Sequence, residues 1–143
     1  MMVRLFKALL KNIIIDIICL AAVIGFEKMM YNGSESDGEI EITISVLQGE
    51  LSGPVVVRIS TRDGSALSDE DYEALNMTLT FSPDMLRIIV TVDIVDDQVD
   101  EEQEYLLAGL ELEPVDGEPA IQIQPDEATI LIEDNDGIGY SNK

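Results

Sequence analysis

The chemistry available to this chain is that of carboxylates. Its 143 residues include 29 Asp and Glu against 8 Lys and Arg, a formal net charge of −21, with one cysteine and no histidine. The absence of histidine excludes imidazole bases and histidine zinc sites, and one cysteine cannot form an internal disulfide or a thiolate cluster. Nucleic acid is disfavoured as a partner because its phosphates repel an acidic surface. Carboxylates in such number suit hard cations, above all Ca²⁺.

Fifteen of the acids gather in four short segments of the chain, spanning residues 35–37, 63–71, 96–104 and 133–136. Arg62 is the one basic residue beside them. The fifteen are Glu35, Asp37, Asp63, Asp69, Glu70, Asp71, Asp96, Asp97, Asp100, Glu101, Glu102, Glu104, Glu133, Asp134 and Asp136.

The stretches between these segments have the two-residue period of β-strands. Apolar Ile40, Ile42, Ile44 and Val46 alternate with polar neighbours, which is typical of a strand with one buried face. The same alternation recurs downstream, and Gly, Pro, Asp and Ser mark the turns. We expect strands at about 24–31, 38–47, 54–62, 77–81, 86–95, 103–112 and 127–133, with no long helix. The pattern predicts an all-β fold, a seven-strand antiparallel β-sandwich.

Such a sandwich places the four acidic segments at one end, because successive strands run up and down. The remaining loop acids belong to the other end and are spread out: Glu50, Asp84, Asp116, Glu118 and Asp126. The alternation also predicts the side chains that face the core between the sheets, namely Ile42, Ile44, Val57, Phe81, Val90, Val92 and Ile130.

The acidic end has two interpretations. In the first interpretation it is a divalent-cation site. Ca²⁺ fits such a site better than Mg²⁺, because Ca²⁺ accepts 6–8 oxygen ligands in flexible geometry. Alternatively, it is a solvated face on a structural spacer with no functional metal site. Glycoside hydrolysis by paired carboxylates is a poor third, since there is no Trp and only 5% of the residues are aromatic. We therefore expect a binding module and not an enzyme.

Residues 1–22 differ from the rest. Arg4, Lys7 and Lys11 precede an apolar run that contains Asp16 and ends in two alanines. A basic start, a short apolar stretch and a small-residue end predict a secretory signal peptide; a membrane anchor, a soluble helix and a wrongly assigned first segment are the alternatives. The expected domain is 23–138, and 139–143 form a tail.

Several motifs in this order resemble those of Calx-beta domains over about residues 23–138. They are the opening Tyr31-Asn-Gly-Ser-Glu35, then Asp63-Gly-Ser-Ala66 with Asp71-Tyr72 and Leu79-Thr-Phe81, then Asp96-Asp97 followed by Glu101 and Glu104, and the closing Thr129-Ile-Leu-Ile-Glu-Asp-Asn-Asp136. Calx-beta domains occur in large extracellular adhesion proteins and as the calcium sensors of sodium–calcium exchangers.

The resemblance implies an immunoglobulin-like sandwich that binds more than one calcium ion at one end. Asn135 stands where the exchanger sensor has a third aspartate, and it offers one neutral oxygen. The residues at the implied ligand positions are Glu35, Asp71, Asp96, Asp97, Glu101, Glu104, Asp134 and Asp136.

The expected function is therefore that of a calcium-binding module in an extracellular or membrane-associated protein, acting in cell adhesion and cell communication. Calcium would stiffen the acidic end and fix its angle to a neighbouring domain or an adhesion partner there. The leader predicts secretion as the route to that location.

Overall fold

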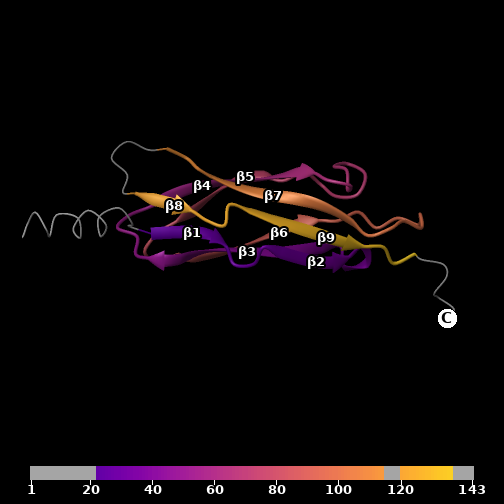
Figure 1. Ribbon diagram of the computed structural model, residues 1–143, viewed down its shortest axis with the longest axis horizontal. Helices are drawn as coiled ribbons and strands as arrows, with labels where there is room; N and C mark the ends of the chain where they lie inside the picture. Colours follow the sequence, from indigo (N-terminus) through magenta and orange to yellow (C-terminus); the bar gives the residue numbers. More distant parts are fainter. Residues whose placement is uncertain (1–21, 115–119, 137–143) are drawn as a thin grey trace, which may run out of the picture.

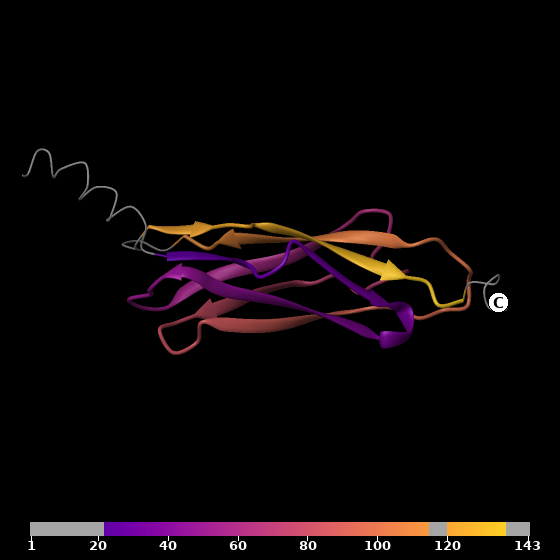
Figure 2. The same cartoon turned by 60° about the horizontal axis from the view of Figure 1, so that its bottom comes forward.

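The computed structural model describes residues 22–114 and 120–136, which form two β-sheets packed face to face (Figures 1 and 2). The strands are β1 (Ala22–Phe26), β2 (Met30–Ser34), β3 (Glu39–Gly49), β4 (Val55–Asp63), β5 (Asn76–Phe81), β6 (Arg87–Asp93), β7 (Glu104–Leu112), β8 (Ile121–Ile123) and β9 (Glu127–Glu133). A 3₁₀ turn, η1 (Glu35–Asp37), follows β2. Among the described residues, no helix has the length and apolar character needed to span a bilayer.

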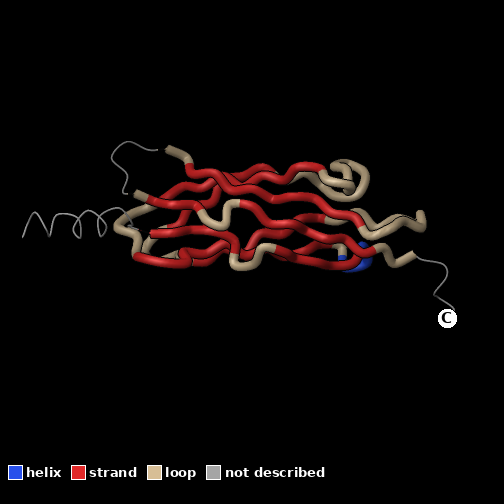
Figure 3. Tube along the Cα trace, viewed as in Figure 1, coloured by secondary structure: helices blue, strands red, loops and turns tan. Residues whose placement is uncertain are grey.

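The predicted all-β sandwich is confirmed. One sheet has four strands in the order β6-β3-β1-β8, and the other has five in the order β2-β9-β7-β4-β5. Most neighbouring strands are antiparallel, while β1 pairs with β8 and β2 with β9 in parallel. The sheets share the long axis of the molecule, so their connections gather at its two ends (Figure 3).

The expected strand at 24–31 is in fact two strands that belong to different sheets. The chain pairs with β3 up to Phe26, crosses the sandwich over Glu27–Met29, and pairs with β9 from Met30 onward. Alternation alone cannot reveal this change, because inward and outward positions keep the same period in both sheets. The three-residue β8 was also not expected, since it is shorter than the stretch needed to establish a period. The described part of the chain therefore holds nine strands where seven were predicted.

The core lies between the sheets and is built from the inward side of each strand. All seven side chains predicted to face it are buried. On β3, Ile42 and Ile44 are fully enclosed, whereas Thr43 between them is half-buried. Tyr72 and Phe26 are the largest fully buried side chains.

Two polar contacts hold the crossing between β1 and β2. The Tyr31 hydroxyl accepts from the backbone nitrogen of Thr43 at 3.3 Å and donates to the backbone oxygen of Thr43 at 3.0 Å. The carboxylate of Glu27 accepts from the Ser45 hydroxyl and from the Arg87 Nε atom, the latter at 2.9 Å. The crossing is thereby fixed to β3 and β6, and β2 is delivered to the end of the molecule where η1 lies.

The leader at 1–22 and the tail at 139–143 can be compared with the structure only in part. Ala22, the last residue of the expected leader, is buried as the first residue of β1. Residues 1–21 and 137–143 lie outside the described residues.

The paired sheets generate a prediction about the core. Replacing Ile44 by Ala should lower the free energy of unfolding by about 2–5 kcal/mol, because a fully buried side chain leaves a cavity. Ile89→Ala on β6 is the matched control: that side chain is 49% exposed, so the change should stay within about 0.5 kcal/mol. Urea unfolding of both variants measures this, and equal losses would contradict the strand register described here.

Candidate functional site

The end of the sandwich that carries η1 brings acidic side chains from four chain segments together. Three groups have carboxylate oxygens within 4.8 Å of one another. The first is Glu35, Asp134 and Asp136; the second is Glu35, Asp97 and Glu101; the third is Asp71, Glu101 and Glu104. We call these residues together with Asp96 the acidic cluster. Seven of the eight residues expected from the sequence belong to a group, and Asp96 joins them through Asn135, as described below.

Glu35 lies at the centre of the cluster and is only 7% exposed. Its place is set by η1, which is closed by a capping box: Ser34 Oγ accepts from the backbone of Ser36, and Asp37 Oδ2 accepts from the backbone of Ser34 at 2.8 Å. Gly33 lets β2 lie close to the start of β3, because a Cβ there would lie 2.7 Å from Ile40 Cγ1. These local contacts turn the Glu35 side chain inward although Ser36 and Asp37, which follow it, are exposed.

Backbone amides orient several members of the cluster. Asp134 accepts from the backbone nitrogens of Glu101 and Asp136, each at 3.2 Å. Asp71 Oδ2 accepts from Leu67 at 2.8 Å, and Asp97 Oδ1 accepts from Val99 at 2.7 Å. These donors fix the carboxylates on their loops: both oxygens of Asp134 accept such a bond, whereas Asp71 and Asp97 each use one oxygen.

Asn135 is a hydrogen-bond donor to the acidic cluster, a role that the sequence analysis did not predict. With its amide nitrogen turned toward the cluster, it donates to Glu35 Oε2 at 3.1 Å and to Asp96 Oδ1 at 3.3 Å. It therefore connects the segment after β9 with the turn after β2 and the connection after β6. The signals in the sequence that pointed to this position were its neighbours Asp134 and Asp136 and the resemblance, which places Asn135 where the exchanger sensor has a third aspartate.

The four basic side chains in the described part of the chain all have their contacts elsewhere. Arg58 pairs with Glu113, Arg62 with Glu127, and Arg87 with Glu27. The Lys28 ammonium lies 5.8 Å from the centre of the Tyr31 ring. Within the described residues, the acidic cluster thus has no Lys or Arg to balance its charge.

Other acids of this end have local structural partners. Asp37 caps η1. Asp63 accepts from the buried Tyr72 hydroxyl at 2.6 Å and from the backbone of Ser68 at 2.9 Å, and both bonds lower its pKa. The fifteen acids that share one end are therefore not one uniform surface, because a central subset is separated from acids that stabilise loops.

Crowding changes the protonation of the cluster. Burial, with the negative charges of Asp134 and Asp97, raises the pKa of Glu35 to about 7. Burial and a hydrogen bond with Glu101 raise the pKa of Glu104 to about 7 as well. The pKa of Asp136 is raised by burial and by the charge of Asp134. In each case loss of water and like charge both disfavour the ionised form.

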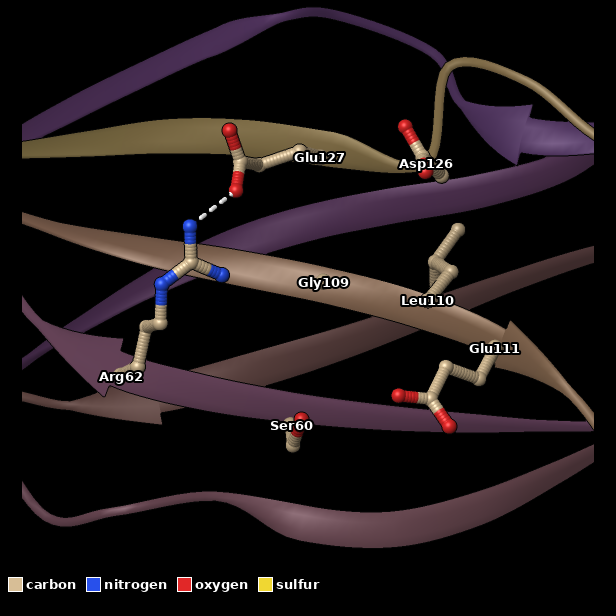
Figure 4. A pocket seen from close by; sticks show the side chains of 7 residues that line it. All are labelled: Ser60, Arg62, Gly109, Leu110, Glu111, Asp126 and Glu127. Carbon is tan, nitrogen blue, oxygen red and sulfur yellow. Dashed lines mark hydrogen bonds and ion pairs between the residues drawn. The ribbon is translucent and has the colours of Figure 1, made fainter.

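A different hollow, of about 340 Å³, lies on the outer face of the five-stranded sheet (Figure 4). Gly109 leaves its floor bare, and the Arg62–Glu127 ion pair crosses it. Its charged side chains, Arg62, Glu111, Asp126 and Glu127, are exposed, and the acids whose pKa values are raised lie in the acidic cluster. The chemistry of this chain is therefore concentrated at the cluster.

Two packed β-sheets with a carboxylate cluster at one end define the class of this protein as a β-sandwich domain of the immunoglobulin-like kind. The model of the family described as Calx-beta domain matches residues 20–136 of this sequence. The chain belongs to the Calx-beta domain family.

The relatives with curated names include sodium/calcium exchangers. Sodium/calcium exchanger 1 of Canis lupus familiaris is 32% identical over 128 residues, which is 80% of this chain and 13% of the exchanger. Sodium/calcium exchanger 3 of Homo sapiens is 29% identical over 131 residues, or 80% of this chain and 14% of the exchanger. The chain thus spans a small fraction of the length of these proteins.

Solved structures agree with this relationship. The apo-form Calx CBD1 domain superposes with a TM-score of 0.73 at 28% identity, covering 82% of this chain and all of that domain. The CBD12 structure from CALX1.2 gives a TM-score of 0.71 at 29% identity, covering 80% of this chain and 46% of that one. The sandwich of Figure 1 is therefore the fold of these domains.

The raised pKa values predict how stability responds to pH without metal. An acid whose pKa is about 7 when folded and 4.5 when unfolded binds its proton more tightly in the native state. When a chelator keeps the protein free of metal, its free energy of unfolding should therefore increase as pH falls from about 7 toward 5. Thermal melting across this range measures the effect.

The control for the pH prediction is the double variant Glu35→Gln with Glu104→Gln, which is neutral at both positions. It should melt higher than the parent at pH above 7 and show a flatter pH response. A parent that loses stability steadily over the same fall in pH would contradict the crowding described here.

Proposed function

We propose that the acidic cluster binds calcium and that this chain is a calcium-binding Calx-beta module. The observation that carries the proposal is the position of Glu35. Its carboxylate is almost fully buried and belongs to two of the three acidic groups. None of the Lys and Arg side chains in the described part of the chain pairs with it. A buried charge without a partner is costly, and a divalent cation supplies the missing positive charge.

The donor set fits calcium. All eight side chains offer carboxylate oxygens, and Asp136 Oδ2 is a buried oxygen with no hydrogen-bond partner among the described residues. Ca²⁺ takes 6–8 oxygens from flexible loops, whereas Mg²⁺ demands strict octahedral geometry. The residues that would hold calcium are Glu35, Asp71, Asp96, Asp97, Glu101, Glu104, Asp134 and Asp136.

Two residues connect the groups. Glu35 is shared by the first and second groups, and Glu101 is shared by the second and third. This sharing supports binding of more than one ion, since each shared carboxylate has two oxygens to offer. Bound calcium would supply the positive charge that lets the connections after β2, β4, β6 and β9 stay close together.

The setting of the module is also part of this proposal. Because the relatives are sodium/calcium exchangers of which the match covers only a seventh or less, we infer a module that works beside further domains. We propose an extracellular or membrane-associated location, reached through the leader at 1–22, and a role in adhesion or cell communication. The partner is a neighbouring domain or an adhesion surface that meets the acidic end.

The second candidate function is that of a spacer with a solvated acidic end. The local roles of Asp37 and Asp63 favour it for the outer acids, which need no cation. The buried position of Glu35 favours calcium for the centre. The two functions differ in whether calcium changes stability.

A calcium titration followed by thermal melting tests the proposal on the full chain. Millimolar calcium should raise the melting temperature of the parent. Glu35→Gln with Glu101→Gln removes both shared carboxylates while keeping their shape. The calcium-dependent stabilisation should then fall by more than about 1.4 kcal/mol, the equivalent of a tenfold loss of affinity at saturating ligand.

Glu50→Gln with Glu111→Gln is the matched control, since both side chains are exposed and far from the acidic groups in the fold. This variant should keep the full calcium response. If both double variants respond as the parent does, or if the parent shows no response, the acidic end is a solvated surface and the spacer function holds.

A further inference from the structure

A row of paired residues crosses the outer face of the five-stranded sheet. In order over β5, β4, β7 and β9 they are Asn76, Ser60, Gly109 and Glu127. Residues that pair directly in a sheet share one face. Ile59 and Ala108, which precede Ser60 and Gly109 along the chain, are fully buried, so the row faces outward. Three of its members line the hollow of about 340 Å³ (Figure 4), and Asn76 lies one strand beyond it.

Asn76 begins the sequence Asn76-Met77-Thr78, which has the Asn-x-Thr pattern of an N-linked glycan acceptor. β5 is an edge strand of its sheet, and Asn76 and Thr78 are both exposed on the outer face. The Asn76 amide oxygen accepts from Arg58 Nη1 at 3.2 Å. Because a guanidinium only donates, the amide nitrogen, which is the atom that carries a sugar, is turned away from Arg58.

The hollow has the chemistry of a sugar site. Gly109 leaves a bare floor on which a sugar ring can lie, and the charged side chains around it offer donors and acceptors to sugar hydroxyls. Its volume lies in the range of about 300–1,000 Å³ that is usual for small-ligand sites. The described residues that line it include no aromatic side chain, so a free sugar would bind weakly.

A sugar attached at Asn76 needs little affinity of its own, because a tether raises its effective concentration at the hollow. Neighbouring strands are about 4.8 Å apart, so Gly109 lies roughly 10 Å from Asn76 across the sheet. A short chain of sugar rings covers this distance. Ser60, between the two, has a small side chain that leaves the path open.

A second motif of this kind, Asn32-Gly33-Ser34, has different surroundings. Ser34 Oγ is engaged as the cap of η1. The row that starts at Asn32 continues across the sheet with the larger side chains of Leu131 and Tyr105. Asn32 borders a smaller hollow, of about 200 Å³, beside η1. Asn76 is thus the motif whose row over the sheet stays open for a sugar chain.

We propose that Asn76 carries an N-linked glycan whose first sugars lie in the hollow over Gly109. This inference rests on the secretory location that is part of the proposed function. In the transfer, Asn76 Nδ2 forms a bond to C1 of the first sugar of a lipid-linked oligosaccharide pyrophosphate. The bond from C1 to the pyrophosphate oxygen breaks, and the proton that the amide loses ends on the released lipid pyrophosphate.

The glycan protects the edge of the sheet. The six residues of β5, 76–81, include no charged side chain and no proline. An uncharged edge strand of this kind is prone to pair with another chain. A bulky hydrophilic group at Asn76 blocks that pairing.

Expression of the full chain with its own leader in a eukaryotic secretory host tests the attachment. Enzymatic release of the glycan in ¹⁸O water converts a glycosylated Asn to a labelled Asp, and mass spectrometry of peptides should find this label at residue 76. Thr78→Val keeps the shape without the hydroxyl and should abolish the label, whereas Thr78→Ser should retain it. Asn32→Gln is the matched control and should leave the label at residue 76 unchanged.

A cycle of variants tests the position of the sugars. All four proteins come from the same host and melt in chelator, so calcium plays no part. Thr78→Val should lower the melting temperature of the parent by about 3 °C, the size expected for a few lost hydrogen bonds. Gly109→Val fills the hollow without a clash, because the nearest atom to an added Cβ is Asp126 O at 3.8 Å. In this background Thr78→Val should have almost no effect.

Gly53→Val is the control background, since a Cβ there meets no atom within 4 Å and the residue lies outside the hollow. The full effect of Thr78→Val should remain in it. An equal effect in the Gly109→Val background would overturn the position of the sugars.

The two proposals fail in different ways. If the full chain does not enter the secretory pathway and neither motif is modified, the proposed location and the glycan are both overturned. If the chain is secreted with Asn76 unmodified, only the glycan is overturned.

Discussion

Repulsion between carboxylates at one end of the sandwich is the constraint on which the rest of this structure depends. Like charges about 4 Å apart cost roughly 1 kcal/mol even in water, and more where water is excluded. The loops that carry these charges could relieve the strain by moving apart, but the strands behind them cannot. Each loop leaves a strand whose inward face is locked into one continuous core, so the energy of the core keeps the charges close.

Backbone N–H groups partly compensate the negative charge of these carboxylates by donating hydrogen bonds to them. Backbone amides on the connections after β4, β6 and β9 donate to Asp71, Asp97 and Asp134. These bonds fix the orientation of the carboxylates that receive them. Glu35, Glu104 and Asp136 lie where water is excluded and like charges gather, and their pKa values rise. The cluster therefore combines carboxylates that are oriented by backbone amides with buried acids that are crowded by like charge.

The sequence predicted strand positions and buried faces where apolar and polar side chains alternate. It could not predict features that depend on which strands pair with one another. The strict two-residue period predicted the burial of Ile42, Ile44 and Val92. The predicted ends of the long strands agree with the observed ends within about two residues. The crossing after Phe26 could not be predicted, because it depends on Tyr31 reaching the backbone of Thr43, twelve residues along the chain. The members of the cluster followed from motif resemblance and from the up-and-down order of strands. The burial of Glu35 and the hydrogen bonds of Asn135 required the packed structure, since neither has a periodic signal.

The parallel pairing of β2 with β9 gives the domain a mechanical character. The two strands lie side by side and run toward the same end of the molecule, one early and one late in the chain. A pulling force that enters through β1 and leaves after β9 acts on them in opposite directions along their axes. The hydrogen bonds of five residue pairs, from Met30 with Thr129 to Ser34 with Glu133, are then loaded together in shear. A hairpin pulled from its open end would release its hydrogen bonds one after another. In the β2–β9 pair the hydrogen bonds must break together. A sandwich whose first and last long segments pair in this way resists extension along its long axis.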